Sequence, residues 1–190
     1  QQYIDYTYSI KGKDYKLGLD VKAVGLQKLL DVKTSSIVLN WDATLLQKEL
    51  NGKSEREKST VFFKEANGNV DHLSETSDDE EKLEDKVNWI AFKQHFFSTV
   101  LTSNQPLSNT NLSVKSDSDA SIVKHYQASA DLVFSGQKDN HYGFSFFFGP
   151  NQYKVLKAQG DDFQKIINMG WGPMGWINKF ITVPIFDFLD

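Results

Sequence analysis

The sequence lacks cysteine altogether and contains a single arginine, Arg56, in 190 residues. Without cysteine the chain has no disulfide bond, no catalytic thiolate and no cysteine-based zinc site, and it suits either the cytoplasm or the periplasm. Arginine is the residue best suited to bind phosphate or carboxylate groups through paired hydrogen bonds, so such sites are not expected to dominate. Together with the net charge of −4, this argues against a nucleic-acid surface, and no nucleic-acid partner is expected.

The sequence also lacks an uncharged apolar run of about 18 residues, which a membrane-spanning helix needs, and no signal peptide opens it. A length of 190 residues with 14 phenylalanines is enough for one well-packed core, so one domain is the default. The chain stops within an apolar run at 184–189, which suggests a piece of a longer protein.

Alternating apolar residues predict strands through most of the chain. Residues 6–10 and 15–24 alternate on either side of the turn at 11–14, which contains Gly12, and this pattern predicts a β-hairpin. Further strands are expected at 36–41, 60–65, 87–101, 122–134 and 141–148. With no helix between so many strands, an antiparallel sandwich or barrel is expected.

Three polar stretches separate these strands. Residues 45–58 predict a loop or a frayed helix, and residues 102–121 predict a surface connection rich in serine and asparagine. Residues 75–86 contain seven acidic residues and two lysines without the spacing of a calcium loop, so they predict a solvated loop.

The stretch 87–101 is apolar on both faces and carries Gln94 and His95 at its middle, which predicts a strand covered on both sides. A sugar enzyme could use His95 or His125 with an acid such as Asp131 as general acid and base. The favoured interpretation makes Gln94 and His95 a structural pair in the core. No metal-binding motif, catalytic motif or cofactor site is evident, so we expect no enzyme, metal or cofactor.

The pattern changes after Gly149-Pro150, where short helices are expected. We predict a β-sandwich over residues 1–160 and a helical segment over 161–190, forming one structural domain overall. The segment 170–190 is amphipathic, and it either packs on its own domain or couples the domain to a membrane surface. The residues expected to make that membrane contact are Trp171, Trp176, Ile177, Phe180, Ile181, Pro184 and Phe188.

Several motifs in order resemble the large periplasmic domain of the YidC family of membrane-protein insertases. The most specific is the aromatic stretch 88–97 with its Gln-His pair. The hairpin at 6–15, the Phe148-Gly149-Pro150 junction followed by Tyr153 and Leu156, and the tail motifs at 170–171, 176–177 and 184–189 also resemble the family.

The resemblance implies an antiparallel β-supersandwich, similar in shape to sugar mutarotases, with short C-terminal helices. It also implies a location on the periplasmic face of the bacterial inner membrane, between transmembrane segments. The implied function is a non-catalytic accessory module for inserting and folding membrane proteins. The implied partners are nascent inner-membrane proteins and the Sec translocon. The alternative is a carbohydrate-binding or mutarotase-like protein.

Overall fold

The computed structural model describes residues 2–31 and 33–167 and divides the chain into two compact units, Gln1–Gly149 and Pro150–Asp190. The first unit contains the strands, which form one continuous network of antiparallel pairs. Helix α2, which the sequence analysis assigned to the sandwich, falls in the second unit.

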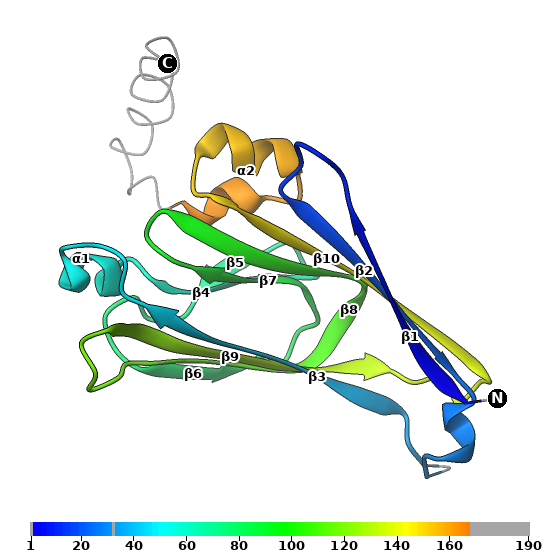
Figure 1. Cartoon of the computed structure of the whole chain (residues 1–190). Coiled ribbons are helices and arrows are strands. Elements are labelled where there is room, and N and C mark those ends of the chain that lie inside the picture. The colour runs from blue at the N-terminus through cyan, green and yellow to red at the C-terminus, as the bar shows by residue number, and fades with distance from the viewer. Residues whose placement is uncertain (1, 32, 168–190) are drawn as a thin grey trace. The chain divides into compact units, whose positions relative to one another are not determined.

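The strands of the first unit are arranged in two layers (Figure 1). The first layer has the order β1-β2-β10-β8-β7-β4-β5, with bounds Tyr3–Ile10, Lys16–Val24, Asp139–Pro150, Phe97–Lys115, Val87–Lys93, Thr60–Glu65 and Val70–His72. The second layer contains β6 (Asp79–Lys82), part of β8, β9 (Ile122–Val133) and β3 (Ser36–Leu46).

Strand β8 belongs to both layers because it is 19 residues long and changes partner along its length. Its first part pairs with β7, where Ser98 lies opposite Lys93. Its last part pairs with β9 and β6, and the register shifts between Ser108 and Asn111. Asn109 within that shift has a positive φ of 47°, a conformation that asparagine tolerates better than most residues. The irregularity lets one strand pass from the first layer to the second.

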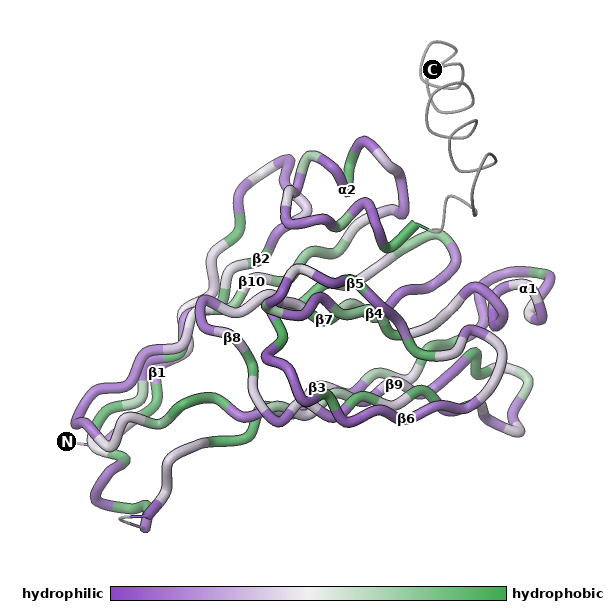
Figure 2. The backbone as a smooth tube through the Cα atoms, turned by 180° about the vertical axis from the view of Figure 1, so that it is seen from behind, coloured by the Kyte–Doolittle hydropathy of each residue, from purple (hydrophilic) through white to green (hydrophobic). Residues whose placement is uncertain are grey.

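The core lies between the two layers, and hydropathy changes back and forth along the strands that enclose it (Figure 2). Alternate residues point to opposite faces of a strand, so each strand gives every second side chain to this core. Fully buried members come from both layers: Val61, Phe63, Ile90, Leu101, Leu112, Val114 and Tyr126.

The helices are short. In the first unit, the 3₁₀ turn η1 spans Leu26–Lys28 and α1 spans Gly52–Glu57, where Asn51 caps the helix by accepting a hydrogen bond from Ser54 N–H at 3.1 Å. In the second unit, α2 (Tyr153–Gln159) packs against the 3₁₀ turn η2 (Phe163–Ile166). The expected short helices after the sheet are therefore confirmed.

Most of the predicted strands are confirmed, whereas two predicted loops and one predicted strand are wrong. The expected surface connection at 102–121 is largely strand β8, and the expected loop at 75–86 contains strand β6. The expected strand at 87–101 is interrupted, because Gln94 N–H donates to the Phe97 carbonyl at 2.8 Å and closes a hairpin between β7 and β8. Gln94 and His95 therefore lie half-buried in a turn, not in the middle of a core strand.

Candidate functional site

The residues predicted to couple the domain to a membrane lie at 168–190, outside the described residues. Their role therefore stays a prediction. They are Trp171, Trp176, Ile177, Phe180, Ile181, Pro184 and Phe188.

The β7–β8 turn joins the two layers through an imidazole–carboxylate contact. His95 Nδ1 lies 2.9 Å from Oε1 and 3.0 Å from Oε2 of Glu49, which follows β3 of the second layer. The His95 ring also stacks on Phe96, with ring centroids 3.9 Å apart. The two partners are only 22% and 23% exposed, so water weakens the contact less than it would on an open surface.

Next to this turn, an aromatic cleft of about 210 Å³ opens between the layers. Trp41 stacks on Phe92 with centroids 3.8 Å apart and meets the edge of Phe146 at 5.9 Å. Apolar side chains from both layers line the cleft: Trp41, Ala43, Leu45, Phe92, Phe97 and Phe148. A concave apolar surface of this kind can accept an apolar group from a partner molecule.

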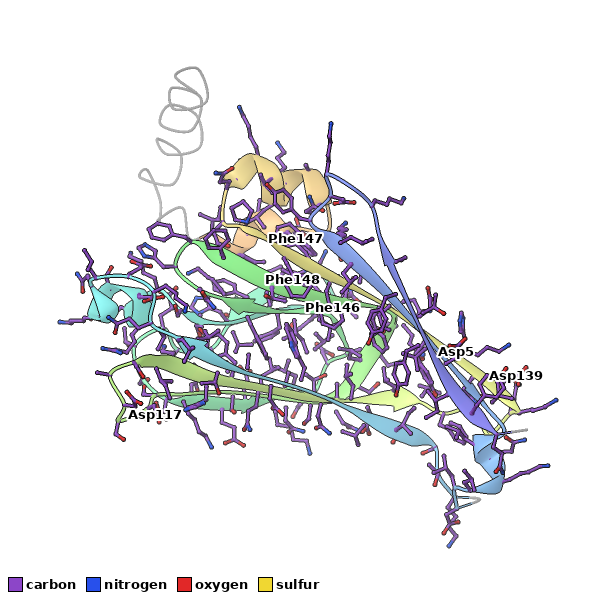
Figure 3. All side chains as sticks on the ribbon, viewed as in Figure 1. Asp5, Asp117, Asp139, Phe146, Phe147 and Phe148 are labelled. Carbon is purple, nitrogen blue, oxygen red and sulfur yellow. The ribbon has the colours of Figure 1, made fainter. Side chains whose placement is uncertain are left out.

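Aromatic rings beside the cleft remain open to solvent. Phe96 and Phe97 of the β7–β8 turn are 57% and 60% exposed, and Phe148 at the end of β10 is 51% exposed. Figure 3 labels Phe148 beside Phe146 and Phe147, the neighbouring aromatic residues of β10. The sequence pattern does not reveal this site, because the apolar run 87–101 predicts one covered strand that includes residues 96 and 97.

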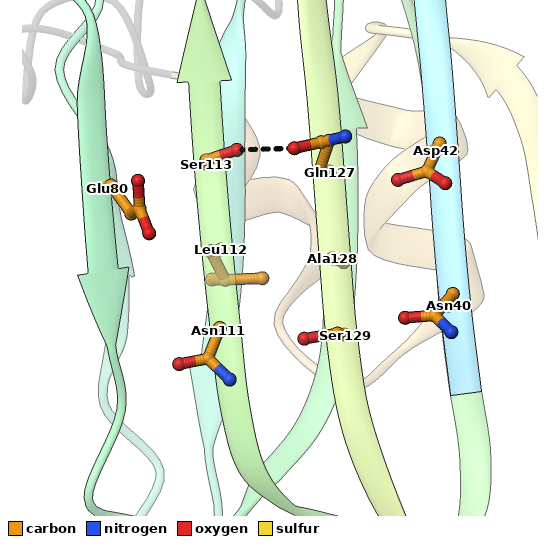
Figure 4. Close-up of a pocket in the computed structure, with 9 residues that line it drawn as sticks. All are labelled: Asn40, Asp42, Glu80, Asn111, Leu112, Ser113, Gln127, Ala128 and Ser129. Carbon is orange, nitrogen blue, oxygen red and sulfur yellow. Dashed lines mark hydrogen bonds between the residues drawn. The ribbon is translucent and has the colours of Figure 1, made fainter. Parts of the chain in front are cut away.

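A second concave surface, a polar groove of about 310 Å³, crosses the solvent face of the second layer (Figure 4). The strand register aligns one polar residue from each of four strands, because Asp42 lies opposite Gln127, Gln127 opposite Ser113, and Ser113 opposite Glu80. Ser113 Oγ donates to Gln127 Oε1 at 3.4 Å. Short amide, hydroxyl and carboxylate groups can bind water or a polar partner, but they include no thiol, amine or imidazole nucleophile.

The residues proposed for sugar chemistry do not come together. His125 Nε2 lies 2.6 Å from Asp117 Oδ2, and its Nδ1 lies 3.0 Å from Thr44 Oγ1. The pKa of the Asp117 carboxyl is lowered, mainly by a hydrogen bond from the Asp119 backbone N–H and then by His125. Asp131 instead accepts a hydrogen bond from Asn109 at 2.8 Å. It lies six residues from His125 on β9, about 20 Å along the strand, so the two cannot act on one substrate atom.

Two buried lysines form a polar network that the sequence analysis missed. Lys124 is 2% exposed, and its Nζ donates to the carbonyls of Ser59 and Glu75 at 2.8 and 2.9 Å. Lys93 is 7% exposed and pairs with Glu75 Oε1 at 3.1 Å. Burial lowers the pKa of the Lys124 ammonium, while nearby Glu75 opposes that change. Lys93, at the end of the largely apolar strand β7 (Val87–Lys93), was the available signal for this network.

The described residues carry neither a metal cluster nor a membrane-spanning helix. Within residues 2–31 and 33–167, no three histidine or acidic side chains are arranged to hold a metal ion. Within the same residues, no helix has the length and apolar character needed to cross a membrane.

Comparison with known proteins identifies relatives along the whole chain. The family model described as the YidC periplasmic domain matches residues 1–188. A protein named membrane protein insertase YidC from Parabacteroides distasonis is 32% identical over 195 residues, covering 98% of this chain and 31% of that protein. Its namesake from Bacteroides fragilis is 31% identical, covering 99% and 32%. The chain thus spans about a third of the length of these curated relatives.

These relatives support an insertase domain and not the carbohydrate-binding alternative. The geometry also argues against the carbohydrate-binding alternative, because His95 contacts Glu49, His125 contacts Asp117, and Asp131 is bound by Asn109.

Proposed function

Because the chain belongs to the YidC periplasmic domain family, we propose that it is an accessory, non-catalytic module of a bacterial inner-membrane insertase. The match to the family model over residues 1–188 carries this proposal. The module lies on the periplasmic face between transmembrane segments and serves to position or recognise partners, while insertion itself is performed elsewhere in the longer protein. His95 and His125 contact different carboxylates, those of Glu49 and Asp117, and Asp131 is bound by Asn109, so the residues predicted for sugar chemistry form no shared site, which supports a non-catalytic role.

The proposed partners are nascent inner-membrane proteins, which the longer insertase receives alone or beside the Sec translocon. The C-terminal segment couples the module to the membrane surface. The support for this coupling is the sequence pattern: at 100° per residue, Ile177, Phe180 and Ile181 share one helical side, whereas Asn178 and Lys179 share the other. Trp171 and Trp176 suit a membrane interface, where one end of the indole ring is in water.

The coupling role is tested in the longer insertase by replacing Ile177, Phe180 and Ile181 with aspartate. Burying three carboxylates at a bilayer surface is unfavourable, so insertion of a reporter membrane protein into proteoliposomes should fall. A matched control replaces Asn178, Lys179 and Thr182 with aspartate on the polar side and should insert normally. If the apolar-side variant inserts as well as this control, the coupling role is wrong.

The accessory role is tested by deleting the sandwich while retaining the chain from Met174 onward. Insertion of the reporter should be largely preserved, because the proposal places the inserting machinery outside this module. Complete loss of insertion, with the shortened protein still present in the membrane at the normal level, would show that the sandwich is essential rather than accessory.

A further inference from the structure

We propose that strand β1 is a docking edge for an extended segment of a partner polypeptide, which adds to the first layer as a further strand. The added strand has apolar side chains at alternate positions and a basic residue opposite Asp5. This inference rests on the proposed role as an interaction module, and it names the chemistry of one partner. It does not depend on the coupling role of the C-terminal segment.

Strand β1 is the terminal strand of the first layer, and it pairs with β2 on one side. Its eight residues are all exposed. Proteins usually protect such edges with lysine, proline or short strands, since a free row of backbone N–H and C=O groups invites pairing. The edge strands β5 and β6 are only three and four residues long, whereas β1 is long and contains neither lysine, arginine nor proline.

The same edge carries a row of large apolar side chains on one face. Ile4, Tyr6, Tyr8 and Ile10 are 46%, 56%, 63% and 77% exposed. Directly paired residues of antiparallel strands share a face, so the strand register shows what lies beside this row.

The apolar row continues the inner face of the first layer beyond the core. Tyr8 lies opposite Leu19 on β2, and Leu19 lies opposite Phe144 on β10. Phe144 is 9% exposed, Leu19 is half-buried, and Tyr8 is 63% exposed. The apolar face of the first layer therefore extends beyond the part that the second layer covers. An added strand with apolar residues at every second position would shield this exposed part.

The long edge strand β3 of the second layer differs in this respect. Its inward side chains Ile37, Leu39 and Trp41 are half-buried against the core, and its outward positions include the polar residues Asn40 and Asp42. Backbone pairing at β3 would therefore bury little additional apolar surface. Within residues 2–31 and 33–167, β1 combines an unpaired backbone edge with an exposed apolar row, and this combination favours it as the docking edge.

The opposite face of β1 determines the charge of the partner. Asp5, labelled in Figure 3, is the one charged residue of β1 and lies opposite Lys22 on β2. A strand added on the other side of Asp5 places a side chain beside this carboxylate, and opposite charges in such cross-strand positions stabilise pairing. The partner strand should therefore carry lysine or arginine there.

The same charge argues against a second copy of this chain as the occupant. In a β1–β1 pair, every residue opposite Asp5 comes from the same eight-residue sequence, which contains no basic side chain. No register can then give Asp5 a complementary charge, and one register sets Asp5 against Asp5. A different polypeptide can place a basic side chain opposite Asp5 and apolar side chains beside the apolar row, so it complements both faces of β1.

The test measures binding of a fluorescent synthetic peptide to the 190-residue chain by anisotropy. The probe is nine residues long and has valine at alternate positions, threonine between them and lysine at one central threonine position. Tyr8→Lys should weaken binding by about ten-fold, because lysine interrupts the apolar row and is the residue that natural edges use against pairing. The matched control is Leu50→Lys, at a fully exposed apolar residue outside the strands, and it should bind like the wild type.

A charge exchange tests the register. Asp5→Lys should weaken binding of the lysine probe by about two- to five-fold and improve binding of a glutamate probe by a similar factor, as expected for one cross-strand pair. Should Tyr8→Lys fail to fold, Tyr8→Thr removes the apolar ring with a residue that favours strands and should also weaken binding.

Three results would overturn the proposal. One is the absence of saturable binding by the wild type, and another is equal weakening by Tyr8→Lys and Leu50→Lys. The third is self-association of the chain that Tyr8→Lys abolishes, which would make a second copy the occupant. The peptide-binding assay contains no membrane and changes no residue of the C-terminal segment, so a negative result would not bear on the membrane-coupling role. Conversely, normal insertion by the variant of the C-terminal segment would not bear on peptide docking at β1.

Discussion

Removing Trp41 should destabilise the domain clearly, although this residue is only half-buried and lies on the edge strand β3. The indole stacks on Phe92 with an interplanar angle of 13° and meets Phe146 at 80°, so one ring from the second layer contacts two rings of the first. Truncating a fully buried tryptophan to alanine costs about 3–5 kcal/mol. Because Trp41 is half-buried, we expect Trp41→Ala to lower the free energy of unfolding by about 2–3 kcal/mol.

The measurement is urea unfolding followed by far-ultraviolet circular dichroism, with Val38→Ala as the control. Val38 lies on the same strand but is 61% exposed, so its truncation should change the free energy of unfolding by less than about 0.5 kcal/mol. The thermal midpoint of Trp41→Ala should fall by about 5–10 °C, given about 2–4 °C per kcal/mol for a domain of this size.

A double-mutant cycle with Phe92→Ala isolates the stacked pair. Aromatic pairs contribute about 0.5–1.5 kcal/mol beyond the area they bury, so the double variant should be less destabilised than the sum of the single variants by about that amount. If Trp41→Ala costs no more than Val38→Ala, or if the two single effects simply add, the inference that this stack ties the layers together is refuted.

Two further predictions concern buried polar groups. Glu55→Gln should lower the free energy of unfolding by about 1.5–3 kcal/mol, because the 2% exposed carboxylate accepts hydrogen bonds from the backbone N–H groups of Lys48 and Glu49. The control is Glu57→Gln, whose side chain is 51% exposed. Equal losses of unfolding free energy for the two variants in urea would contradict the prediction. Tyr126→Phe should cost about 1–2 kcal/mol near neutral pH, because the fully buried hydroxyl donates to the Lys93 carbonyl at 2.8 Å. Burial raises the pKa of Tyr126 well above 10.0, so above pH 10 the unfolded chain loses a proton that the folded chain keeps. The contribution of Tyr126 to stability is thus present below pH 10 and declines above it. The difference in unfolding free energy between the wild type and Tyr126→Phe should therefore become smaller above pH 10. A difference that stays constant to pH 11.5 would contradict the raised pKa of Tyr126.

The parts of the fold that the sequence predicts best are those where periodicity and turn chemistry agree. The β1–β2 hairpin has alternation on both sides of a turn that contains Gly12, and the structure pairs the two strands in continuous register. The strand at 60–65 is confirmed with the bounds Thr60–Glu65. In both cases the local pattern and the tertiary contacts favour the same structure.

The candidate site was harder to predict, because its turn carries no turn signal. The β7–β8 connection at His95 and Phe96 contains no glycine, proline, asparagine or aspartate, and neither residue has a positive φ. Such a turn requires no special residue, so an apolar run with two strands and one turn looks like a single strand. Strand β6 was hidden for a different reason: its four side chains are charged and mostly exposed, and pairing with β8 places them in an edge strand rather than in the core.

Stability and docking should be separable in this domain, because they depend on residues with no shared partners. Buried polar groups near α1 hold the layers together, since Lys124 bonds to carbonyls before β4 and after β5, and Glu55 holds the segment after β3. The β1 edge presents exposed rings that the core does not enclose. Effects at sites without shared partners usually add within about 0.5 kcal/mol. Tyr8→Lys should therefore weaken peptide binding at nearly constant unfolding free energy, whereas Glu55→Gln should destabilise the fold at nearly constant peptide affinity under conditions where both proteins are folded.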